Sequence, residues 1–295
     1  MTAAMDRATD RRTGAVLTTL LSSLMLGTSY VAVKMTVGEV NPFLLGAATM
    51  AVGSALLLAY MVLKGKLDRA MLKRWEFWAG PIINTGVVAP SYVGLTMTTA
   101  SAAGLIIGTN VVFVALFSRL LFGERLSRRR LLGLGIALLG LVTLTTRWDL
   151  SVLDGSQLTG NLLVLLSSAC IGVSVVTSRI ALRRLTAEQW SLSLHLLLPP
   201  ALLALYFLIP LEGGLSSASL PAALFIGVVC TTVPTVLWTS ALKHISVVTS
   251  ATILMVESAF AVFLSWLFLG EVIDTYVLAG AAMIFVAILL MARSE

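Results

Sequence analysis

One ionisable side chain stands at the centre of a long apolar stretch and is well placed to do chemistry. Residues 246–271 read SVVTSATILMVESAFAVFLSWLFLGE, and Glu257 is their only ionisable side chain before the closing Gly270-Glu271 pair. Because a helix needs roughly 20 residues to cross the hydrocarbon core of a bilayer, Glu257 is expected near the midplane. An unpaired carboxylate at that depth is costly and usually functional. Glu257 is therefore expected to exchange a proton or bind a substrate ammonium group; the alternative is a protonated carboxyl that hydrogen-bonds a neighbouring helix.

Three further polar side chains are candidates for substrate binding. Asn110 and Asn84 are expected at midplane depth, where an amide either contacts a substrate or joins two helices by hydrogen bonds. His195 lies about two turns into an apolar segment, and an imidazole titrates near neutral pH. A structural role is the simpler interpretation of a single histidine in that segment. The second histidine, His244, is in a loop and is given no role.

Aromatic residues and prolines complete the set of candidates. Trp238, Tyr30 and Tyr92 lie near the ends of apolar segments, where an interfacial belt is the common explanation and stacking against a substrate ring the less common one. Pro90 and Pro234 fall in corresponding segments of the two halves of the chain. Because proline removes a backbone hydrogen bond and permits bending, both are candidate hinges. Pro81, Pro199 and Pro200 are also expected to interrupt helices.

Signatures of enzymes and of metal sites are missing from the sequence. It contains no Ser-His-Asp set, no Walker loop and no H-E-x-x-H motif. Cys170 and Cys230 are separate and lie inside apolar runs, so neither a disulfide nor a metal site is implied. Transport without nucleotide hydrolysis or a cofactor is therefore expected. The rival classes are an intramembrane enzyme, which needs cooperating polar residues, and a passive structural subunit.

The composition places these residues in a membrane. Hydrophobic residues make up 58% of the 295-residue chain and charged residues 12%, whereas soluble domains have about 25% charged residues. An integral membrane protein is expected. The net charge of +6 comes from short basic clusters between apolar runs, which is the pattern of cytoplasmic loops rather than of a nucleic-acid surface.

Apolar segments divide the chain into ten expected transmembrane helices, so the predicted fold class is an all-α integral membrane protein. Asn41-Pro42 is a helix start, with proline in the first turn. Lys64-Gly65, Asp154-Gly155 and Glu212-Gly213 mark helix ends or turns. The ten segments are residues 14–34, 42–63, 76–95, 98–121, 130–146, 158–178, 189–209, 220–241, 246–269 and 272–292.

Basic residues predict the orientation of these segments. With the N-terminus in the cytoplasm, 18 of the 20 lysines and arginines fall on the cytoplasmic side, and only Lys34 and Arg147 fall outside. A multi-pass protein of the inner (plasma) membrane with both termini in the cytoplasm is expected. The N-terminal basic stretch precedes an apolar run long enough to span, with no small-residue cleavage site, so it is interpreted as an uncleaved first helix. Lys34 and Arg179 end equivalent helices and are interpreted as interface anchors.

The sequence also repeats itself. An offset of 147 residues lays positions 99–124 on 246–271, so that both stretches end in Gly-Glu and Asn110 falls on Glu257. An offset of 145 lays Gly27-Thr28-Ser29 on Gly172-Val173-Ser174. Each repeat, residues 14–146 and 157–292, holds five expected helices, and an odd number requires the second copy to be inverted. Inverted repeats around a midplane site are typical of secondary transporters.

These motifs resemble those of the drug/metabolite transporter superfamily, specifically the EamA-type exporters. The resemblance rests on two five-helix halves, each with Gly-x-Ser in its first helix and Gly-Glu after its fourth, and covers about residues 14–291. Within that group the chain is most similar to the YddG-type exporters of aromatic amino acids. It departs from them at Leu26, where a tryptophan is frequent, and in the uncharged second segment. The resemblance implies an export pathway lined mainly by helices one, three, four, six, eight and nine.

The expected pathway is apolar, with one carboxyl, two amides and no deep lysine or arginine. Phosphorylated substrates are disfavoured, because burying a phosphate without a cation is costly. A small amphipathic solute is expected, with an aromatic or large apolar amino acid as the first choice, exported by alternating access. Lipophilic drug cations, exchanged for protons, are the alternative. The bilayer and a small-molecule substrate are the expected partners, and the chain is expected to act as a monomer.

Overall fold

The structure, a computed structural model, describes residues 2–122, 128–146, 148, 155–215, 219–245, 250, 253–254 and 256–292, and regular secondary structure in these residues is helical. The elements of the first half are α1 (Thr2–Thr36), α2 (Pro42–Leu63), η1 (Arg69–Lys73), α3 (Trp75–Met97), α4 (Ala100–Gly108), α5 (Asn110–Phe122) and α6 (Arg128–Thr146). Those of the second half are α7 (Ser156–Ala181), α8 (Ala187–Leu196), α9 (Leu198–Leu208), α10 (Leu220–Phe225), η4 (Ile226–Thr232), α11 (Val233–Ala241), α13 (Val256–Leu269) and α14 (Thr275–Ala292).

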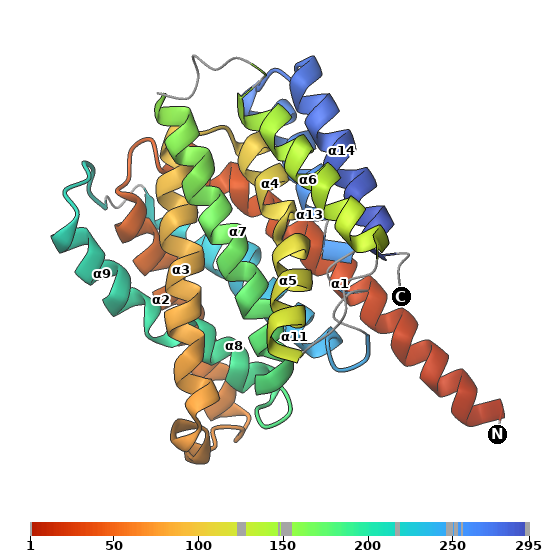
Figure 1. Ribbon diagram of the computed structural model, residues 1–295. Helices are drawn as coiled ribbons and strands as arrows, with labels where there is room; N and C mark the ends of the chain where they lie inside the picture. Colours follow the sequence, from red (N-terminus) through yellow and green to blue (C-terminus); the bar gives the residue numbers. More distant parts are fainter. Residues whose placement is uncertain are drawn as a thin grey trace.

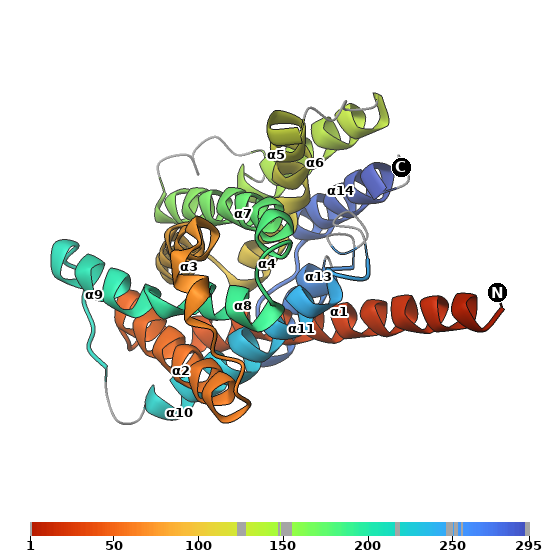
Figure 2. The same cartoon turned by 90° about the horizontal axis from the view of Figure 1, so that it is seen from below.

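These helices form a single bundle in which the two halves are interleaved (Figure 1). Seen along the bundle in Figure 2, α5, α6 and α14 lie on one side, and α2, α9 and α10 lie on the other. Between them, α1, α3, α4, α7, α8, α11 and α13 surround the centre. Helices distant in the sequence are therefore neighbours in the fold.

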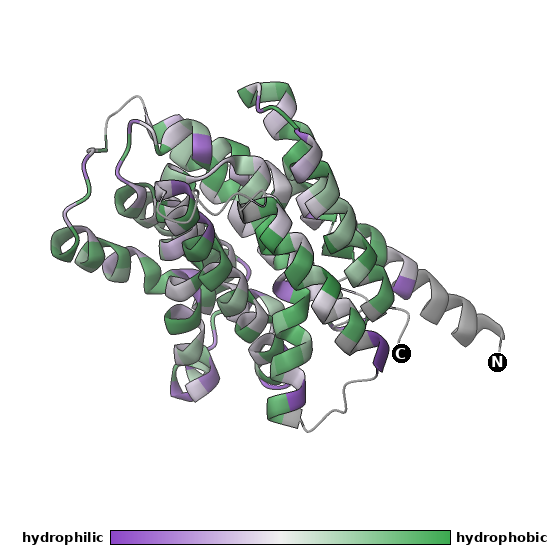
Figure 3. Ribbon diagram, turned by 45° about the horizontal axis from the view of Figure 1, so that its top comes forward, coloured by the Kyte–Doolittle hydropathy of each residue, from purple (hydrophilic) through white to green (hydrophobic). Residues whose placement is uncertain are grey.

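Several of these helices have the length and hydropathy of membrane spans. Six stretches qualify: Arg12–Thr36, Pro42–Leu63, Ala100–Leu121, Ser156–Ala181, Ala187–Leu208 and Leu220–Ala241. Shorter apolar helices cover Gly135–Leu144, Val256–Leu269 and Thr275–Ala287. Apolar residues follow the helices, and hydrophilic ones gather towards helix ends and connections (Figure 3). The structure thus agrees with a helical membrane protein, and the count of ten crossings stays a prediction.

Local signals explain the helix boundaries. Asn41 caps α2: its Oδ1 accepts hydrogen bonds from the backbone N–H of Phe43 (2.9 Å) and Leu44 (3.4 Å), with Pro42 in the first turn. Gly65, with a φ of +62°, follows the last residues of α2, where a left-handed conformation favours glycine. The expected start and end of this helix are confirmed. Asp154 and Arg147 lie outside the described residues.

One segment expected as a continuous helix is interrupted, two segments that prolines were expected to interrupt do contain irregular turns, and a third segment expected to be interrupted is continuous. Segment 98–121 breaks at Thr109, and segment 189–209 breaks at Leu197 immediately before α9. Segment 220–241 contains the π-helical turn η4 just before Pro234. In contrast, α3 continues through both Pro81 and Pro90, so the prediction that these prolines interrupt the helix is wrong. Membrane helices tolerate such prolines because neighbouring groups satisfy the freed carbonyls.

Glycines bring the first helix of each half against the fourth helix of the other. A Cβ added to Gly27 would lie 2.7 Å from the carbonyl oxygen of Glu257 and 3.3 Å from the Cβ of Phe260. A Cβ added to Gly172 would lie 2.5 Å from the Cβ of Phe113. Gly27 and Gly172 correspond at the 145-residue offset, and Phe113 and Phe260 at the 147-residue offset. The two halves therefore use equivalent residues for a close helix crossing.

Serine hydroxyls join the halves by equivalent hydrogen bonds. In each half, consecutive serines of the first helix donate to backbone carbonyls of the third and fourth helices of the other half. The bonds are Ser22 to Pro234 (2.8 Å), Ser167 to Val87 (2.7 Å), Ser23 to Leu254 (3.2 Å) and Ser168 to Ile107 (3.2 Å). The donors correspond at offset 145 and the acceptors at offset 147. Hydroxyl groups thus connect the helices of an apolar core, where hydrogen bonds contribute to association.

The glycine crossings predict a specific loss of stability. Gly27→Ala and Gly172→Ala should each destabilise the purified protein by about 1–3 kcal/mol, because overpacking forces the helices apart. Thermal unfolding in detergent, followed by circular dichroism, measures the effect. Gly14→Ala is the matched control, since a Cβ at Gly14 meets nothing within 4 Å. Equal unfolding temperatures for all three variants would contradict the assigned crossings.

Candidate functional site

A cavity of about 190 Å³ lies at the centre of the bundle. Its wall is mainly apolar and carries no lysine or arginine among the described residues. Side chains with polar atoms interrupt this wall at intervals. They are Ser29, Tyr30, Asn84, Ser91, Tyr92, Asn110, Ser167, Ser174, His195, Cys230, Thr231, Thr235, Trp238 and Glu257. The six side chains expected to bind substrate, Glu257, Asn110, Asn84, Trp238, Tyr30 and His195, are thus brought to one cavity.

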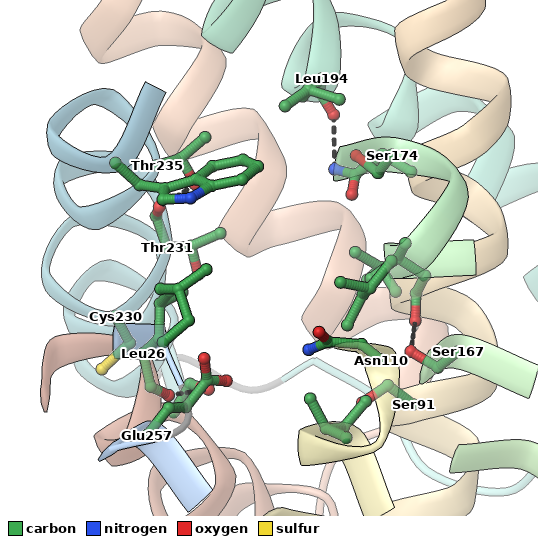
Figure 4. A pocket seen from close by; sticks show the side chains of 18 of the residues that line it. Leu26, Ser91, Asn110, Ser167, Ser174, Leu194, Cys230, Thr231, Thr235 and Glu257 are labelled. Carbon is green, nitrogen blue, oxygen red and sulfur yellow. Dashed lines mark hydrogen bonds between the residues drawn. The ribbon is translucent and has the colours of Figure 1, made fainter. Parts of the chain in front are cut away.

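Glu257 and Tyr30 form the polar centre of one wall. Glu257 lies in the first turn of α13, and its Oε1 accepts a hydrogen bond of 2.5 Å from the Tyr30 hydroxyl of α1. Both residues are buried, at 8% and 6% exposure. Within the described part of the chain, Glu257 Oε2 accepts no hydrogen bond, and the carboxyl points into the cavity (Figure 4). This leaves one carboxyl oxygen for a ligand or a proton.

Asn110 projects from the opposite wall towards Glu257 (Figure 4). It is the first residue of α5, directly after the break at Thr109. Because Asn110 and Glu257 correspond at the 147-residue offset, related helices place their polar residues face to face. Tyr30 corresponds to Val175 at the 145-residue offset, and both line the cavity. Glu257 thus has the Tyr30 hydroxyl as a partner, whereas the equivalent residue on the Asn110 side of the cavity, Val175, is apolar.

Asn84 joins two helices by a hydrogen bond, which is one of the two roles predicted for its amide. Its Nδ2 donates to the carbonyl oxygen of Leu194 at 2.7 Å, near the end of α8. α8 ends at Leu196, and the last four carbonyls of a helix lack their usual helical donors. Asn84 therefore joins α3 to the break between α8 and α9 while it lines the cavity.

His195 is fully enclosed at the same break. Its Nδ1 lies 2.7 Å from the Ser191 carbonyl oxygen, which can only accept, so Nδ1 carries the hydrogen. Its Nε2 is buried without a partner in the described residues, as is the hydroxyl of Thr232 at the end of η4. Both groups border Gly53 of α2, where an added Cβ would clash with them. The α2–α8–η4 junction therefore holds two unsatisfied polar groups.

The three aromatic residues are not an interfacial belt, and that explanation is wrong. Tyr30, Tyr92 and Trp238 are all buried and line the cavity. The indole Nε1 of Trp238 donates to the hydroxyl of Ser250 at 2.9 Å. Sequence position along an apolar segment did not show which way these side chains face, because that depends on the rotation of each helix within the bundle. Their rings form part of the inner wall.

Several lining residues were not expected from the sequence. Ser167 and Ser174 of α7, and Thr231 and Thr235 around η4, add hydroxyl groups. Their spacing of seven and four residues is that of one helical face, and this periodicity was the available signal. Met50 of α2 and Leu194 of α8 also line the cavity. The resemblance implies expected helices one, three, four, six, eight and nine as the main lining, which correspond to α1, α3, α4 with α5, α7, α10 to α11, and α13.

Lys34 is half-buried and binds the end of a neighbouring helix. Its Nζ donates to the carbonyl oxygens of Leu95 (2.8 Å) and Thr98 (2.6 Å) at the end of α3. Arg179, its counterpart at offset 145, is exposed at the end of α7. The Gly-Glu pair of the first half, Gly123-Glu124, lies outside the described residues.

Comparison with known proteins gives the family. The profile of the EamA-like transporter family matches residues 13–146 and, a second time, residues 158–293. The chain belongs to the EamA-like transporter family. A solved crystal structure with 21% sequence identity has a TM-score of 0.71 and covers 96% of this chain and 100% of its own, which shows a shared fold.

Curated relatives of this EamA-like chain are also transporters by description. An uncharacterized transporter of Archaeoglobus fulgidus is 27% identical over 147 residues, 49% of this chain and 50% of its own. Another from Methanothermobacter thermautotrophicus is 30% identical over 173 residues, 52% of this chain and 50% of its own. The uncharacterized transporter YyaM of Bacillus subtilis is 22% identical over 146 residues, 48% of each chain. The matches span about half the length of these relatives.

The unsatisfied hydroxyl of Thr232 generates a prediction. Thr232→Val should leave the unfolding temperature unchanged or raise it, because it removes a buried polar group that has no partner. Thr239→Val, on α11, is the matched comparison: its hydroxyl donates to Thr235 at 2.7 Å and lies 3.1 Å from that of Ser191. Its loss should cost about 0.5–1.5 kcal/mol. Thermal unfolding of both purified variants tests this, and a larger loss in Thr232→Val would contradict the assignment.

Proposed function

We propose that this chain is a secondary transporter that exports small amphipathic metabolites from the cytoplasm, with aromatic or large apolar amino acids as the first choice. The observation that carries the proposal is the central cavity, in which one buried carboxyl, Glu257, faces an otherwise mainly apolar wall. Such a wall accepts a hydrophobic body, and the carboxyl accepts an ammonium group or a proton. Buried ionisable groups in membrane segments usually serve this kind of function.

The architecture proposed for this function is a pair of inverted five-helix repeats, residues 14–146 and 157–292. The double match of the family profile supports the duplication. The equivalent serine bonds and glycine crossings support a two-fold relation between the halves. Five crossings per repeat require opposite orientations, with both termini in the cytoplasm and the protein in the inner membrane. The binding site then lies between the repeats, as in other secondary transporters.

Each part of an amino acid has a complementary group in the cavity. The ammonium group is assigned to Glu257 Oε2, since Oε1 is bound by Tyr30. The apolar side chain is assigned to the wall around Ile107 and Ile171, with the ring of Trp238 for stacking. The carboxylate is assigned to the amide of Asn110 and neighbouring serine hydroxyls, because the described wall offers no lysine or arginine. This assignment follows the YddG-type resemblance.

The size of the cavity favours a metabolite over a drug. Its volume of about 190 Å³ is below the roughly 300–1,000 Å³ of pockets for drug-sized ligands. A lipophilic cation exchanged for protons is nevertheless the second candidate. The observation that favours it is a carboxyl in a cavity without a lining cation, which suits a substrate with a positive charge and no carboxylate.

Alternating access is assigned to bending at the third helix of each half. Pro234 follows the π-helical turn η4, and π turns of this kind are frequent at functional sites. Thr231 stabilises the turn, because its hydroxyl donates to the Ile226 carbonyl at 2.8 Å. Pro90 lies inside the unbroken α3. The two hinge candidates thus differ in local structure, and we assign the larger bend to the Pro234 side.

The flux of defined substrates tests the proposed function. Protein reconstituted in liposomes should move phenylalanine and tryptophan down a gradient faster than aspartate or lysine, because charged side chains lose hydration in an apolar wall. Radiolabelled uptake in parallel with protein-free liposomes measures the rates. Movement of ethidium without movement of any amino acid would replace the first candidate by the second. Movement of none of these solutes would reject both.

Glu257 provides a second test. Glu257→Gln should lower substrate flux more than about tenfold, because a hydrogen bond to a charged group contributes about 1.5–3 kcal/mol. Tyr30→Phe should cause a smaller loss, since it removes one partner of the carboxyl. Glu212→Gln, an exposed carboxyl far from the cavity lining, is the control and should transport normally. Expression and unfolding temperature of each variant should stay near the original; a loss of folding in step with flux would support the structural alternative.

A further inference from the structure

A second pocket, of about 300 Å³, is lined mainly by cations. Its described lining has three basic side chains, two leucines and no carboxyl: Arg179, Leu182, Arg183, Leu242 and Lys243. In the described part of the chain, neither the Arg183 guanidinium nor the Lys243 ammonium has an ion-pair partner. Because like charges around a hollow concentrate ions of the opposite sign, this basic pocket attracts anions.

The basic pocket and the central cavity are built on the same two helices. Val175 of α7 and Trp238 of α11 line the cavity. Four residues further along the chain from each, Arg179 and Leu242 line the basic pocket. Four residues make about one helical turn, or roughly 6 Å along the axis. The basic pocket therefore lies next to the cavity, towards the ends of α7 and α11.

One apolar cluster lies between the two spaces. Val175 and Trp238 are buried in it, and Leu242 packs against it. Val175 and Trp238 line the cavity, whereas Leu242 lines the basic pocket. A solute that moves from the pocket into the cavity therefore passes apolar side chains. Such a passage suits a solute with an apolar body and opposes a bare ion.

The basic pocket lies at the end of the bundle that is predicted to face the cytoplasm. Ala241 and Ile245, which flank Leu242 and Lys243 in the sequence, cluster with Ala15 near the start of the stretch Arg12–Thr36. Basic residues are expected on the cytoplasmic side. A solute that is to be exported meets the protein from that side.

The helix dipole gives a simpler explanation of some of these charges. Cations are favoured at helix C-termini, and Arg179 lies in the last turn of α7. Arg183 and Lys243, in contrast, follow the ends of α7 and α11 and line one pocket from both. Neither dipole requires two helices to direct cations into a shared hollow. A ligand with a negative group accounts for that convergence.

We propose that the basic pocket is the cytoplasmic entry site of the transport pathway, where Arg183 and Lys243 bind the carboxylate of an amphipathic solute. The apolar part of the solute then passes Val175 and Trp238 into the cavity, where Glu257 binds its ammonium group. Cations first and a carboxyl second fit a zwitterion such as an amino acid, whereas a lipophilic cation is repelled at the entry. The proposal rests on the proposed function and assigns it substrates that carry a carboxylate.

The native Cys230 tests this route without a transported substrate, because it lines the central cavity. With Cys170→Ala as background, Cys230 is the one remaining thiol of the chain. Its reaction rates with anionic sulfonatoethyl and cationic trimethylammonioethyl methanethiosulfonate are measured in inside-out vesicles of zwitterionic lipid. Each rate is divided by that of the same reagent with free cysteine, and the quotient of the two results is the anion preference.

The anion preference should exceed one and should depend on the two proposed ligands. Arg183→Gln and Lys243→Gln should each lower it by roughly threefold or more, because each removes a charge that concentrates anions at the entry. Added salt should lower the preference of the original protein towards that of Arg183→Gln/Lys243→Gln, since exposed charges are screened. In right-side-out vesicles these substitutions should change nothing.

A matched control makes the result specific to the pocket. Lys64→Gln removes an exposed charge at the end of α2 that lines neither space, and it should leave the anion preference unchanged. Arg183 and Lys243 are also exposed, so unfolding temperatures should match among all variants. Equal preferences in the original protein and the double variant, or no reaction of Cys230 from the cytoplasmic face, would overturn the entry site.

Two further results separate this proposal from its neighbours. Basic pockets between membrane helices also bind anionic lipid headgroups. Phosphatidylglycerol retained by the purified original protein and lost from the double variant, with equal anion preferences, would assign the pocket to lipid and reject the entry site. If the anion preference changes as expected but phenylalanine and tryptophan are not transported, the entry site for anions stands and the amino-acid substrate is wrong.

Discussion

The structure depends on one constraint: backbone groups freed at helix breaks in an apolar bundle need hydrogen-bond partners from elsewhere in the chain. α3 and α4 meet at a turn whose carbonyls bind Lys34 and whose N–H groups bind Glu271. The end of α8 has its Leu194 carbonyl bound by Asn84. Each of these partners comes from a part of the chain that is distant in sequence. The breaks that give the bundle its shape are therefore also the points that hold its helices together.

A nearly symmetric framework supports an asymmetric site. The serine bonds and glycine crossings recur in both halves at matched positions, whereas the residues that face each other across the cavity are a carboxyl and an amide (Figure 4). Related helices thus place Glu257 and Asn110 on facing walls of the cavity, and the two walls differ in chemistry. That difference supports a substrate with unlike ends, such as the amine and the apolar body of an amino acid.

The close glycine crossings explain how a small polar site is kept in place. Gly27 lets α1 approach the backbone of Glu257 itself, so the Tyr30 hydroxyl, one turn later in α1, reaches the carboxyl. Gly108 brings α4 equally close to Ser258, the neighbour of Glu257, and Gly104 brings it close to Ala261, one turn later in α13. A larger residue at any of these positions would move the carboxyl relative to the cavity. Backbone approach, rather than a network of charges, positions the site.

The sequence alone determined the helical membrane class, the internal repeat, the start and end of α2, and the choice of Glu257 and Asn110 as a related pair. These follow from composition, hydropathy, capping residues and residue spacing, all of which are local properties. The other candidate residues, including Asn84 and His195, were also chosen from the sequence. The helix packing that brings them to one cavity was not predicted. The family profile agrees with the resemblance at the level of the EamA-like family; the substrate and the inverted orientation remain proposals.

Only the tertiary structure decided which way each side chain faces. Tyr30, Tyr92 and Trp238 line the cavity rather than the outer surface of the bundle, and Lys34 binds the end of α3. The facing direction depends on the rotation of each helix, which is fixed by contacts between residues far apart in the chain, such as Gly27 with Glu257. Whether a proline breaks a helix likewise depends on its neighbours, so Pro90 stays within α3 while Pro234 follows a π turn. Local sequence signals contain no information about those distant contacts.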